Sequence, residues 1–157
     1  FSKGYDAVIG KTILVGNEHY KQDRVKVFYN DIEVTAPSVN LGYRKDKFFY
    51  VGGFNDSFVT AEDIDLNIRS AKAGFKFGYC DQCLVYARVR GDMRSFIRQA
   101  FWNGYGRGQL AEKYPDVFSH TMVNVNMDPF NIIRLMAGIC GFVYYRITGK
   151  SSKSEKK

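Results

Sequence analysis

Short runs of apolar residues alternate with polar stretches through the first half of the chain, and this pattern predicts an α/β protein. Residues 7–15 are rich in β-branched side chains and predict a buried strand. Residues 24–30 alternate between apolar and polar positions and predict a second strand. The segments 75–80 and 83–89 predict two further short strands.

A helix is expected over residues 61–73, where a loop with two adjacent glycines gives way to helical periodicity. Its apolar residues recur at the spacing of one inward face, at Ile64, Ile68 and Ala71. Thr60 is a suitable N-cap, and Asp63 stands three positions later as in a capping box. Gly74 follows as the C-terminal cap.

Three more helical segments are expected: a single turn at 45–51, a long amphipathic helix at 92–113 and an apolar stretch at 130–147. The charge-free core of the last one covers only residues 135–145, whereas a helix needs about 20 apolar residues to span a bilayer. Arginines flank that core and a lysine-rich tail follows, which favours a helix lying at a membrane surface. The alternative is a helix packed on the protein.

The basic residues are unevenly distributed. Residues 1–85 carry 11 basic and 11 acidic side chains, whereas residues 86–157 carry 12 basic and 5 acidic ones, which accounts for the net charge of +7. A basic second half indicates an anionic partner such as phosphate, nucleic acid or lipid, or else a solvated basic face. At 157 residues, 45% of them hydrophobic, the chain is long enough for a folded core and is not a disordered chain.

The sequence contains three cysteines, Cys80, Cys83 and Cys140. So low and odd a number argues against a disulfide scaffold and for thiols in a reducing compartment. Cys80 and Cys83 form a lone C-x-x-C with no second pair, and zinc normally requires four ligands, so no metal site is expected in this chain.

Two familiar phosphate-binding motifs are incomplete, and a serine nucleophile has no support. Gly10-Lys11-Thr12 ends like a P-loop, but Tyr5 stands where the first glycine is needed. The glycines of 104–108 do not follow a predicted strand, which argues against a dinucleotide site. The chain also lacks the G-x-S-x-G of a nucleophile elbow.

The carboxylates of the 61–73 helix divide by geometry. Asp63 and Asp65 lie about 200° apart around the helix axis, so they face different surroundings. Asp65 and Arg69 are one helical turn apart and are expected to form an ion pair. By local sequence alone, Asp63 is either a capping acid near the positive end of the helix dipole or a catalytic base.

Residues 38–75 resemble the acceptor-side half of the inverting glycosyltransferases of the large GT-A family, similar to family 2. The family pattern is an Asn, a basic residue, a V-G-G-F loop, an E-D-x-D-L helix start, an Arg and a closing A-G-F or A-G-Y. The matching positions are Asn40, Arg44, Val51-Gly52-Gly53-Phe54, Glu62-Asp63-Ile64-Asp65-Leu66, Arg69 and Ala73-Gly74-Phe75. A looser similarity extends to the helix around Trp102.

This resemblance implies a partial GT-A fold, with a mixed sheet, flanking helices and a C-terminal amphipathic helix. It implies that Asp63 is the general base that takes the proton of an acceptor hydroxyl as this attacks the sugar. Glu62 would hold the acceptor or orient the base, and Gly52 and Gly53 would let the backbone approach the sugars. The remaining implied donor- or acceptor-binding residues are Asn40, Arg44, Phe54, Arg88, Arg90 and Trp102.

The chain departs from the family pattern in two places. The family's D-x-D motif, which holds Mg or Mn on the nucleotide diphosphate, precedes the segment that this chain matches. A histidine that many members carry after the helix is replaced here by the stretch 85–90, in which Arg88 or Arg90 would neutralise diphosphate charge, unless both are plain surface residues. The Q-x-x-R-W signature of processive members is also not met, since Trp102 lacks the preceding Arg.

The sequence therefore predicts the acceptor-binding part of an inverting, nucleotide-sugar-dependent glycosyltransferase, which on its own has little activity. Residues 1–126 are expected to form that part, 127–149 the apolar helix and 150–157 a disordered basic tail. Expected partners are a nucleotide-sugar donor, a sugar or lipid-linked acceptor and an anionic membrane surface at the cytoplasmic face; nucleic acid is not expected. The alternative is a non-catalytic basic module that binds membranes or nucleic acid.

Overall fold

A computed structural model of the chain describes residues 4–21, 25–118 and 128–149. The chain forms two compact units. The first, called the sheet unit below, combines Phe1–Gly16, Lys21–Ser57 and Glu62–Val89. The second, called the helical unit, combines Asn17–Tyr20, Phe58–Ala61 and Arg90–Lys157.

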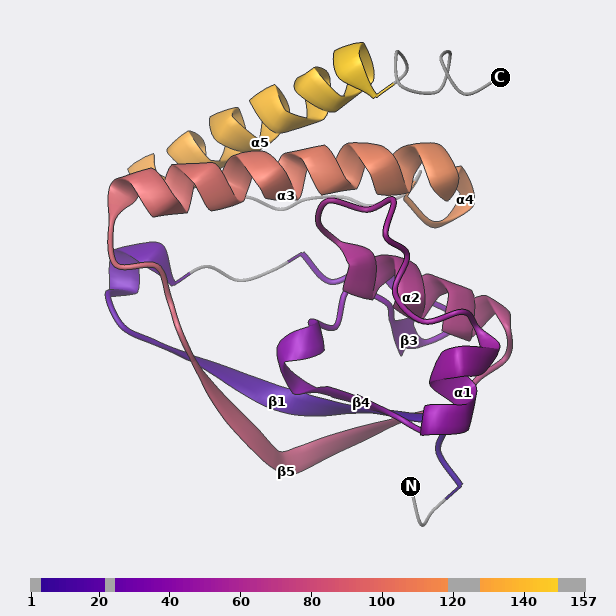
Figure 1. Ribbon diagram of the computed structural model, residues 1–157. Coiled ribbons are helices and arrows are strands. Elements are labelled where there is room, and N and C mark those ends of the chain that lie inside the picture. Colours follow the sequence, from indigo (N-terminus) through magenta and orange to yellow (C-terminus); the bar gives the residue numbers. More distant parts are fainter. Residues whose placement is uncertain (1–3, 22–24, 119–127, 150–157) are drawn as a thin grey trace. The chain divides into compact units, whose positions relative to one another are not determined.

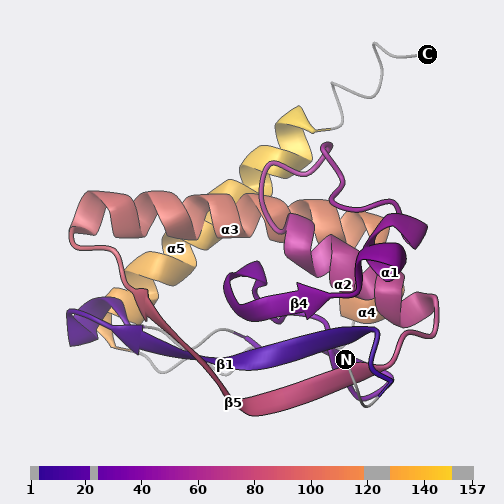
Figure 2. The same ribbon diagram turned by 60° about the horizontal axis from the view of Figure 1, so that its bottom comes forward.

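A mixed three-stranded sheet organises the sheet unit. Its central strand β1 (Ala7–Val15) runs antiparallel to β4 (Leu41–Tyr43) and parallel to β5 (Phe77–Arg88), as Figures 1 and 2 show. The predicted α/β class with a mixed sheet is confirmed, while the GT-A topology stays a prediction. Only Ala7 and Ile9 of β1 are buried, so the expectation of a wholly buried strand is wrong.

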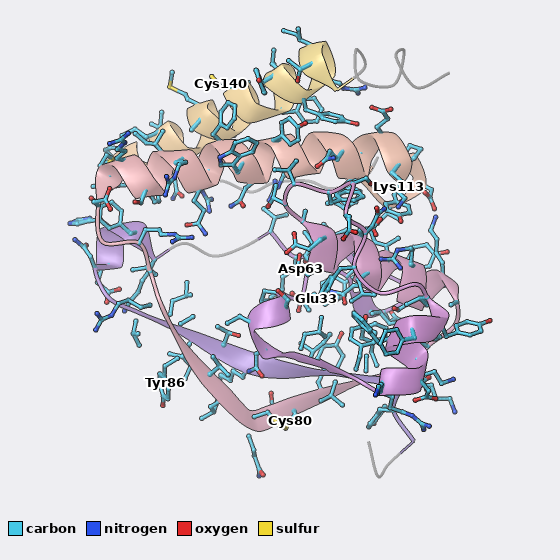
Figure 3. The ribbon with its side chains drawn as sticks, viewed as in Figure 1. Glu33, Asp63, Cys80, Tyr86, Lys113 and Cys140 are labelled. Atoms are coloured by element: carbon cyan, nitrogen blue, oxygen red, sulfur yellow. A yellow bond between two sulfur atoms is a disulfide. The ribbon has the colours of Figure 1, made fainter. Side chains whose placement is uncertain are left out.

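The two short strands expected at 75–80 and 83–89 are one strand, β5, with an irregularity in its middle. Gly10 pairs with Cys80 and Lys11 with Leu84, so three residues of β5 leave the ladder between them. This excursion brings Cys80 and Cys83 together in a disulfide, at the bend of β5 visible in Figure 3. The expectation that both are thiols is therefore wrong, and Cys140 is the exposed free cysteine.

The strand expected at 24–30 is also shorter than predicted. Only β2 (Phe28–Tyr29) forms, paired antiparallel with β3 (Ile32–Glu33). Between them Asn30 and Asp31 adopt φ values of 48° and 61°. Two successive residues with positive φ make the tight turn of a hairpin, a conformation that Asn and Asp tolerate. The turn ends β2 where the prediction also ends, so the difference lies at the start of the segment, where residues 25–27 are not part of the strand.

Two helices complete the sheet unit: α1 (Lys45–Tyr50) and α2 (Glu62–Lys72), both as predicted to within a residue or two. Leu66, Ile68 and Ala71 of α2 are buried in the core, and α2 lies over one face of the sheet (Figures 1 and 2). After α2, Gly74 takes a φ of 76°, as the predicted C-terminal cap requires. The 3-10 turn η2 (Ser38–Asn40) also belongs to the sheet unit, whereas the 3-10 turn η1 (Glu18–Tyr20) belongs to the helical unit.

Polar side chains also join α2 to the rest of the sheet unit. The Asn67 carboxamide donates to the backbone carbonyls of Val34 and Ala36, at 3.1 and 2.9 Å. Its Oδ1 accepts a 2.9 Å hydrogen bond from the hydroxyl of Tyr43 on β4. Burial raises the pKa of Tyr43 to about 12. Asn67 is fully buried, so these bonds satisfy groups that water cannot reach.

The helical unit consists of α3 (Met93–Lys113), the short α4 (Pro115–Phe118) and α5 (Pro129–Thr148). The predicted long helix and apolar helix are both confirmed. Asp92 caps α3 by accepting from the Ser95 N–H, and Asp128 caps α5 in the same way. The predicted basic tail, 150–157, and part of the segment before α5 lie outside the described residues.

Helices α3 and α5 run in the same general direction and cross obliquely in close contact (Figures 1 and 2). Near their starts the rings of Phe96 and Phe130 lie 6.4 Å apart, and near their ends the Tyr145 hydroxyl donates to Glu112 at 2.8 Å. Between these points Gly104 lies directly against the carbonyl of Gly138, where a side chain would collide with the α5 backbone. Glycine at this crossing lets the two backbones approach closely.

Candidate functional site

Asp63 lies in the first turn of α2, half-buried (Figure 3). Its Oδ2 accepts a 2.9 Å hydrogen bond from the backbone N–H of Ser38 in η2, and its Oδ1 accepts one from Ile64 at 2.8 Å. The expected capping box is wrong, because the helix begins at Glu62 and the carboxylate binds η2 instead of reaching back to Thr60. These two N–H donors fix the orientation of the Asp63 side chain.

The predicted ion pair within α2 is confirmed and has a further role. Asp65 is fully buried and accepts from Nε of Arg69 at 2.8 Å. The other guanidinium nitrogens donate to the backbone carbonyls of Val51 and of Gly53, the latter at 2.6 Å. Arg69 therefore connects the α2 helix to the V-G-G-F loop. The spacing of the pair was visible in the sequence, whereas its contact with the loop carbonyls was not predictable from residue types.

The two loop glycines are required by backbone conformation. Gly52 and Gly53 have φ values of 84° and 65°, in the left-handed region that disfavours other residues. A Cβ on Gly53 would lie 3.1 Å from the Phe48 ring, whereas one on Gly52 would meet nothing within 4 Å. The turn itself therefore explains both glycines, and close approach to a sugar stays a prediction.

Asn40 supports the irregular part of β5. Its Nδ2 donates to the backbone carbonyls of Lys11, at 3.1 Å, and Cys83, at 2.8 Å. A side chain at Gly10 would overlap the Asn40 carboxamide. Asn40 and Ser38 belong to the same 3-10 turn, so one short element contacts both the disulfide excursion and the Asp63 carboxylate. These contacts give Asn40 a positioning role inside the sheet unit.

An aromatic cavity of about 410 Å³ opens in the sheet unit beside these residues. Its lining residues are Ser38, Leu41, Tyr43, Lys45, Phe48, Phe49, Phe54 and Leu66. Phe54 follows the loop glycines, and its ring contacts that of Phe48 with a centroid distance of 5.4 Å. Of the predicted site residues, the structure thus brings Phe54 to the cavity that Ser38 also lines. The other rings of the cavity, Tyr43, Phe48 and Phe49, were not identified from the sequence.

Arg44 and Arg88 are exposed and do not line this cavity. Arg44 immediately precedes α1 and donates to the Asp46 carboxylate at 3.2 and 3.3 Å. These hydrogen bonds hold the pKa of Asp46 below its usual range. Arg88 is the last residue of β5. Their predicted roles in binding substrate stay predictions.

A second cavity, of about 280 Å³, belongs to the helical unit and brings Arg90 and Trp102 together. Its other lining residues are Val59, Thr60, Ser95, Arg98, Gln99 and Asn103. Two arginines with a tryptophan, an asparagine and hydroxyl groups are suited to an anionic, hydrogen-bonding ligand. The sequence indicated Arg90 and Trp102; Arg98 and Asn103 join them because they lie on the same face of α3.

Within the described ranges 4–21, 25–118 and 128–149, no group of three or more His, Cys, Asp or Glu side chains is placed to hold a metal ion. The family's D-x-D motif, which binds the divalent ion, precedes the segment that this chain matches. Asp63-Ile64-Asp65 on α2 also reads D-x-D, but Asp65 is fully buried and paired with Arg69, whereas Asp63 binds the Ser38 N–H. The side chains around Asp63 therefore do not fit such an ion.

Comparison with known proteins gives one kind of relative. The chain is 34% identical over 82 residues to the pre-mycofactocin glycosyltransferase of Mycobacterium tuberculosis, in the strains CDC 1551 / Oshkosh and ATCC 25618 / H37Rv. The matched region covers 52% of this chain and 17% of each relative. No protein-family model matches the chain, and no solved structure does. Over about half of its length, therefore, this chain is similar to a glycosyltransferase.

Proposed function

We propose that this chain supplies the acceptor-side part of a glycosyltransferase, which transfers a sugar from a nucleotide-diphosphate donor to an acceptor hydroxyl with inversion. The similarity to a glycosyltransferase supports sugar transfer. The geometry that carries the proposal is the Asp63 carboxylate, held by the Ser38 N–H beside an aromatic cavity. The similarity covers only 17% of the length of each relative. We therefore assign the activity to the complete polypeptide and not to this chain alone.

Asp63 acts as the general base. A carboxylate has about four lone-pair positions, and the N–H groups of Ser38 and Ile64 occupy one on each oxygen. The remaining positions accept the proton of the acceptor hydroxyl as its oxygen bonds to the anomeric carbon. The diphosphate leaves from the opposite face of the sugar, which inverts the anomeric centre. Glu62, the preceding residue, holds or orients the acceptor.

The aromatic cavity of the sheet unit binds the acceptor. Pyranose rings present apolar C–H faces that pack on aromatic side chains, and the lining contains Tyr43, Phe48, Phe49 and Phe54. Lys45 and Ser38 supply polar atoms at the same surface. Arg69 keeps the loop that carries Phe54 in place through the Gly53 carbonyl. Asn40 and Arg44 act beside this surface as positioning and binding residues.

Arginines of the chain neutralise the charge of the donor's diphosphate. Arg90 shares a cavity with Arg98 and Trp102, and guanidinium groups bind phosphate oxygens in pairs. Arg88 is exposed two residues earlier in the chain. A divalent ion, Mg or Mn, would supply further neutralisation when bound by the D-x-D segment of the complete enzyme. The proposed location of the enzyme is the cytoplasmic face of the membrane, as a peripheral or anchored protein; the apolar helix α5 and the basic second half of the chain support a membrane location.

The proposal is tested by incubating the complete polypeptide with single nucleotide sugars and with a panel of sugar and lipid-linked acceptors. We expect a product whose anomeric configuration, read by proton NMR, is opposite to that of the donor. Retention of configuration would contradict the inverting mechanism. Strong, salt-sensitive RNA binding together with no turnover of any nucleotide sugar would favour the non-catalytic module instead.

A further inference from the structure

Helix α5 carries a continuous apolar face that is exposed. Seven large side chains on it are between 37% and 70% exposed: Ile132, Leu135, Met136, Ile139, Val143, Tyr144 and Ile147. Successive members are one, three or four residues apart, a spacing that keeps them on one broad face of the helix. Cys140 is exposed between them (Figure 3). A contiguous apolar stripe of this length on a surface indicates an interaction site.

The other face of α5 is held by α3 from end to end. Gly138 and Gly141 lie against the α3 backbone at Gly104 and Phe101, and Tyr145 donates to Glu112. The paired stretch of α3 also carries charged residues, among them Arg98, Arg107 and Glu112. Helices α3 and α5 therefore form a packed pair in which the exposed side of α5 is apolar.

Basic residues accompany the apolar stripe. Arg146 is exposed on α5, near the edge of the stripe by helix geometry, and its long side chain can extend to a charged surface. The sequence after α5 adds Lys150, Lys153, Lys156 and Lys157. Apolar residues on one helix face with cations beside them are typical of helices that bind anionic lipid.

We propose that α5 lies in the plane of an anionic lipid bilayer, with its apolar stripe in the headgroup region and α3 covering its other side. Among the described residues, α5 is the helix that is long and apolar enough to cross a membrane, by length and composition. A spanning α5 would carry the charged stretch of α3 into the hydrocarbon as long as the pair holds, which is unfavourable. This orientation does not depend on the chemistry assigned to Asp63.

Cys140 provides a probe of depth, because it lies near the middle of α5 and is the free cysteine of the chain. The chain is labelled there with an environment-sensitive fluorophore and mixed with vesicles of equal parts phosphatidylglycerol and phosphatidylcholine. We expect the emission of the fluorophore to shift to the blue when vesicles are added. Its fluorescence should be quenched best by lipid-borne quenchers at shallow depth, since in-plane helices bury their apolar face only about 5–10 Å deep. A Cys140→Ser chain reports any labelling at Cys80 or Cys83.

Quenching strongest at the bilayer centre would overturn the in-plane orientation in favour of a span. No binding to these vesicles would overturn the lipid assignment, and a dimer in sedimentation would then identify a second copy as the occupant. Equally strong binding to vesicles of pure phosphatidylcholine would contradict the proposed attraction of the basic residues to anionic lipid.

Two matched variants test whether the stripe makes the contact. Ile139→Asp places a charge on the stripe, and Ile97→Asp makes the same change at a 39% exposed position on α3. Ile139→Asp should weaken vesicle binding by about tenfold or more, because an apolar side chain leaves the bilayer. Ile97→Asp should retain most of the binding, with helicity unchanged by circular dichroism in both. An equal loss in both variants would contradict the assigned face.

Discussion

The backbone N–H of Ser38 lies 2.9 Å from Oδ2 of Asp63, so the proposed base is oriented by an element that precedes it by 25 residues in the chain. The N–H belongs to η2, the same turn whose Asn40 holds the carbonyl of Cys83. The position of Asp63 therefore depends on contacts at two ends of this short turn. This dependence can be tested at each end.

Ser38→Pro removes the N–H and leaves the turn able to form. Ser38 begins η2, and Pro37 before it has a ψ of 146°, which a following proline accepts. The complete enzyme should lose about tenfold or more in kcat with donor affinity unchanged, because the carboxylate is no longer held. Ser38→Ala keeps the N–H and reports the loss of the hydroxyl alone. Equal kinetics for the two variants would show that the N–H does not position the base.

Replacing both Cys80 and Cys83 with serine should loosen the other end of the turn. A cross-link closing so short a loop stabilises a fold by about 2 kcal/mol on the chain-entropy account. We expect a loss of that order in urea unfolding, together with a lower kcat in the complete enzyme. Adding a dithiol reductant to the unmodified protein should reproduce the kinetic change. If neither the double serine variant nor the reductant changes kcat, the disulfide does not influence the position of Asp63.

The buried ion pair of α2 gives a prediction for stability. Arg69→Ala leaves the fully buried Asp65 carboxylate without its partner and frees the Val51 and Gly53 carbonyls. Removing one member of a buried pair costs about 3–5 kcal/mol, measurable by urea unfolding. The double variant Asp65→Leu with Arg69→Met should recover part of this loss, since no charge stays buried. A double variant less stable than Arg69→Ala would contradict the explanation.

The raised pKa of Tyr43 predicts that the free energy of unfolding falls at alkaline pH. Its pKa is raised from about 10 to about 12 by burial, so the folded state favours the neutral hydroxyl. The contribution is complete below the unfolded pKa and is lost as pH rises through the folded value. The stability difference between the natural protein and Tyr43→Phe should therefore stay constant below about pH 10 and shrink as the pH rises from about 10 to about 12. A difference that stays constant or grows would contradict the buried, neutral Tyr43.

The elements with strong local signals were predictable from the sequence. The 3.6-residue periodicity of Ile64, Ile68 and Ala71 marked α2, and the Asp65–Arg69 spacing indicated their ion pair. Interactions between distant segments were not predictable in this way. The Ser38–Asp63 hydrogen bond uses a backbone group, which no residue type reveals. The Cys80–Cys83 disulfide depends on a shift of register between β1 and β5, which neither strand encodes alone.

The same distinction applies to the candidate site. Asp63 and the V-G-G-F loop stood out as residues in a family-like order, whereas nothing in the sequence pointed to Phe48 and Phe49, which line the cavity together with Ser38. Likewise, Arg98 and Asn103 join Arg90 and Trp102 only through the face of α3 that they share.

The most direct test of the account is the turnover of an Asp63→Asn variant of the complete enzyme. Transfer should fall by about 10²–10⁴, because the amide cannot take the hydroxyl proton, while nucleotide-sugar binding by calorimetry is retained. Asp31→Asn is the matched control, since Asp31 is exposed at a positive φ that Asn tolerates, and its turnover should be unchanged. Near-normal transfer by Asp63→Asn would contradict the assignment of Asp63 as the base.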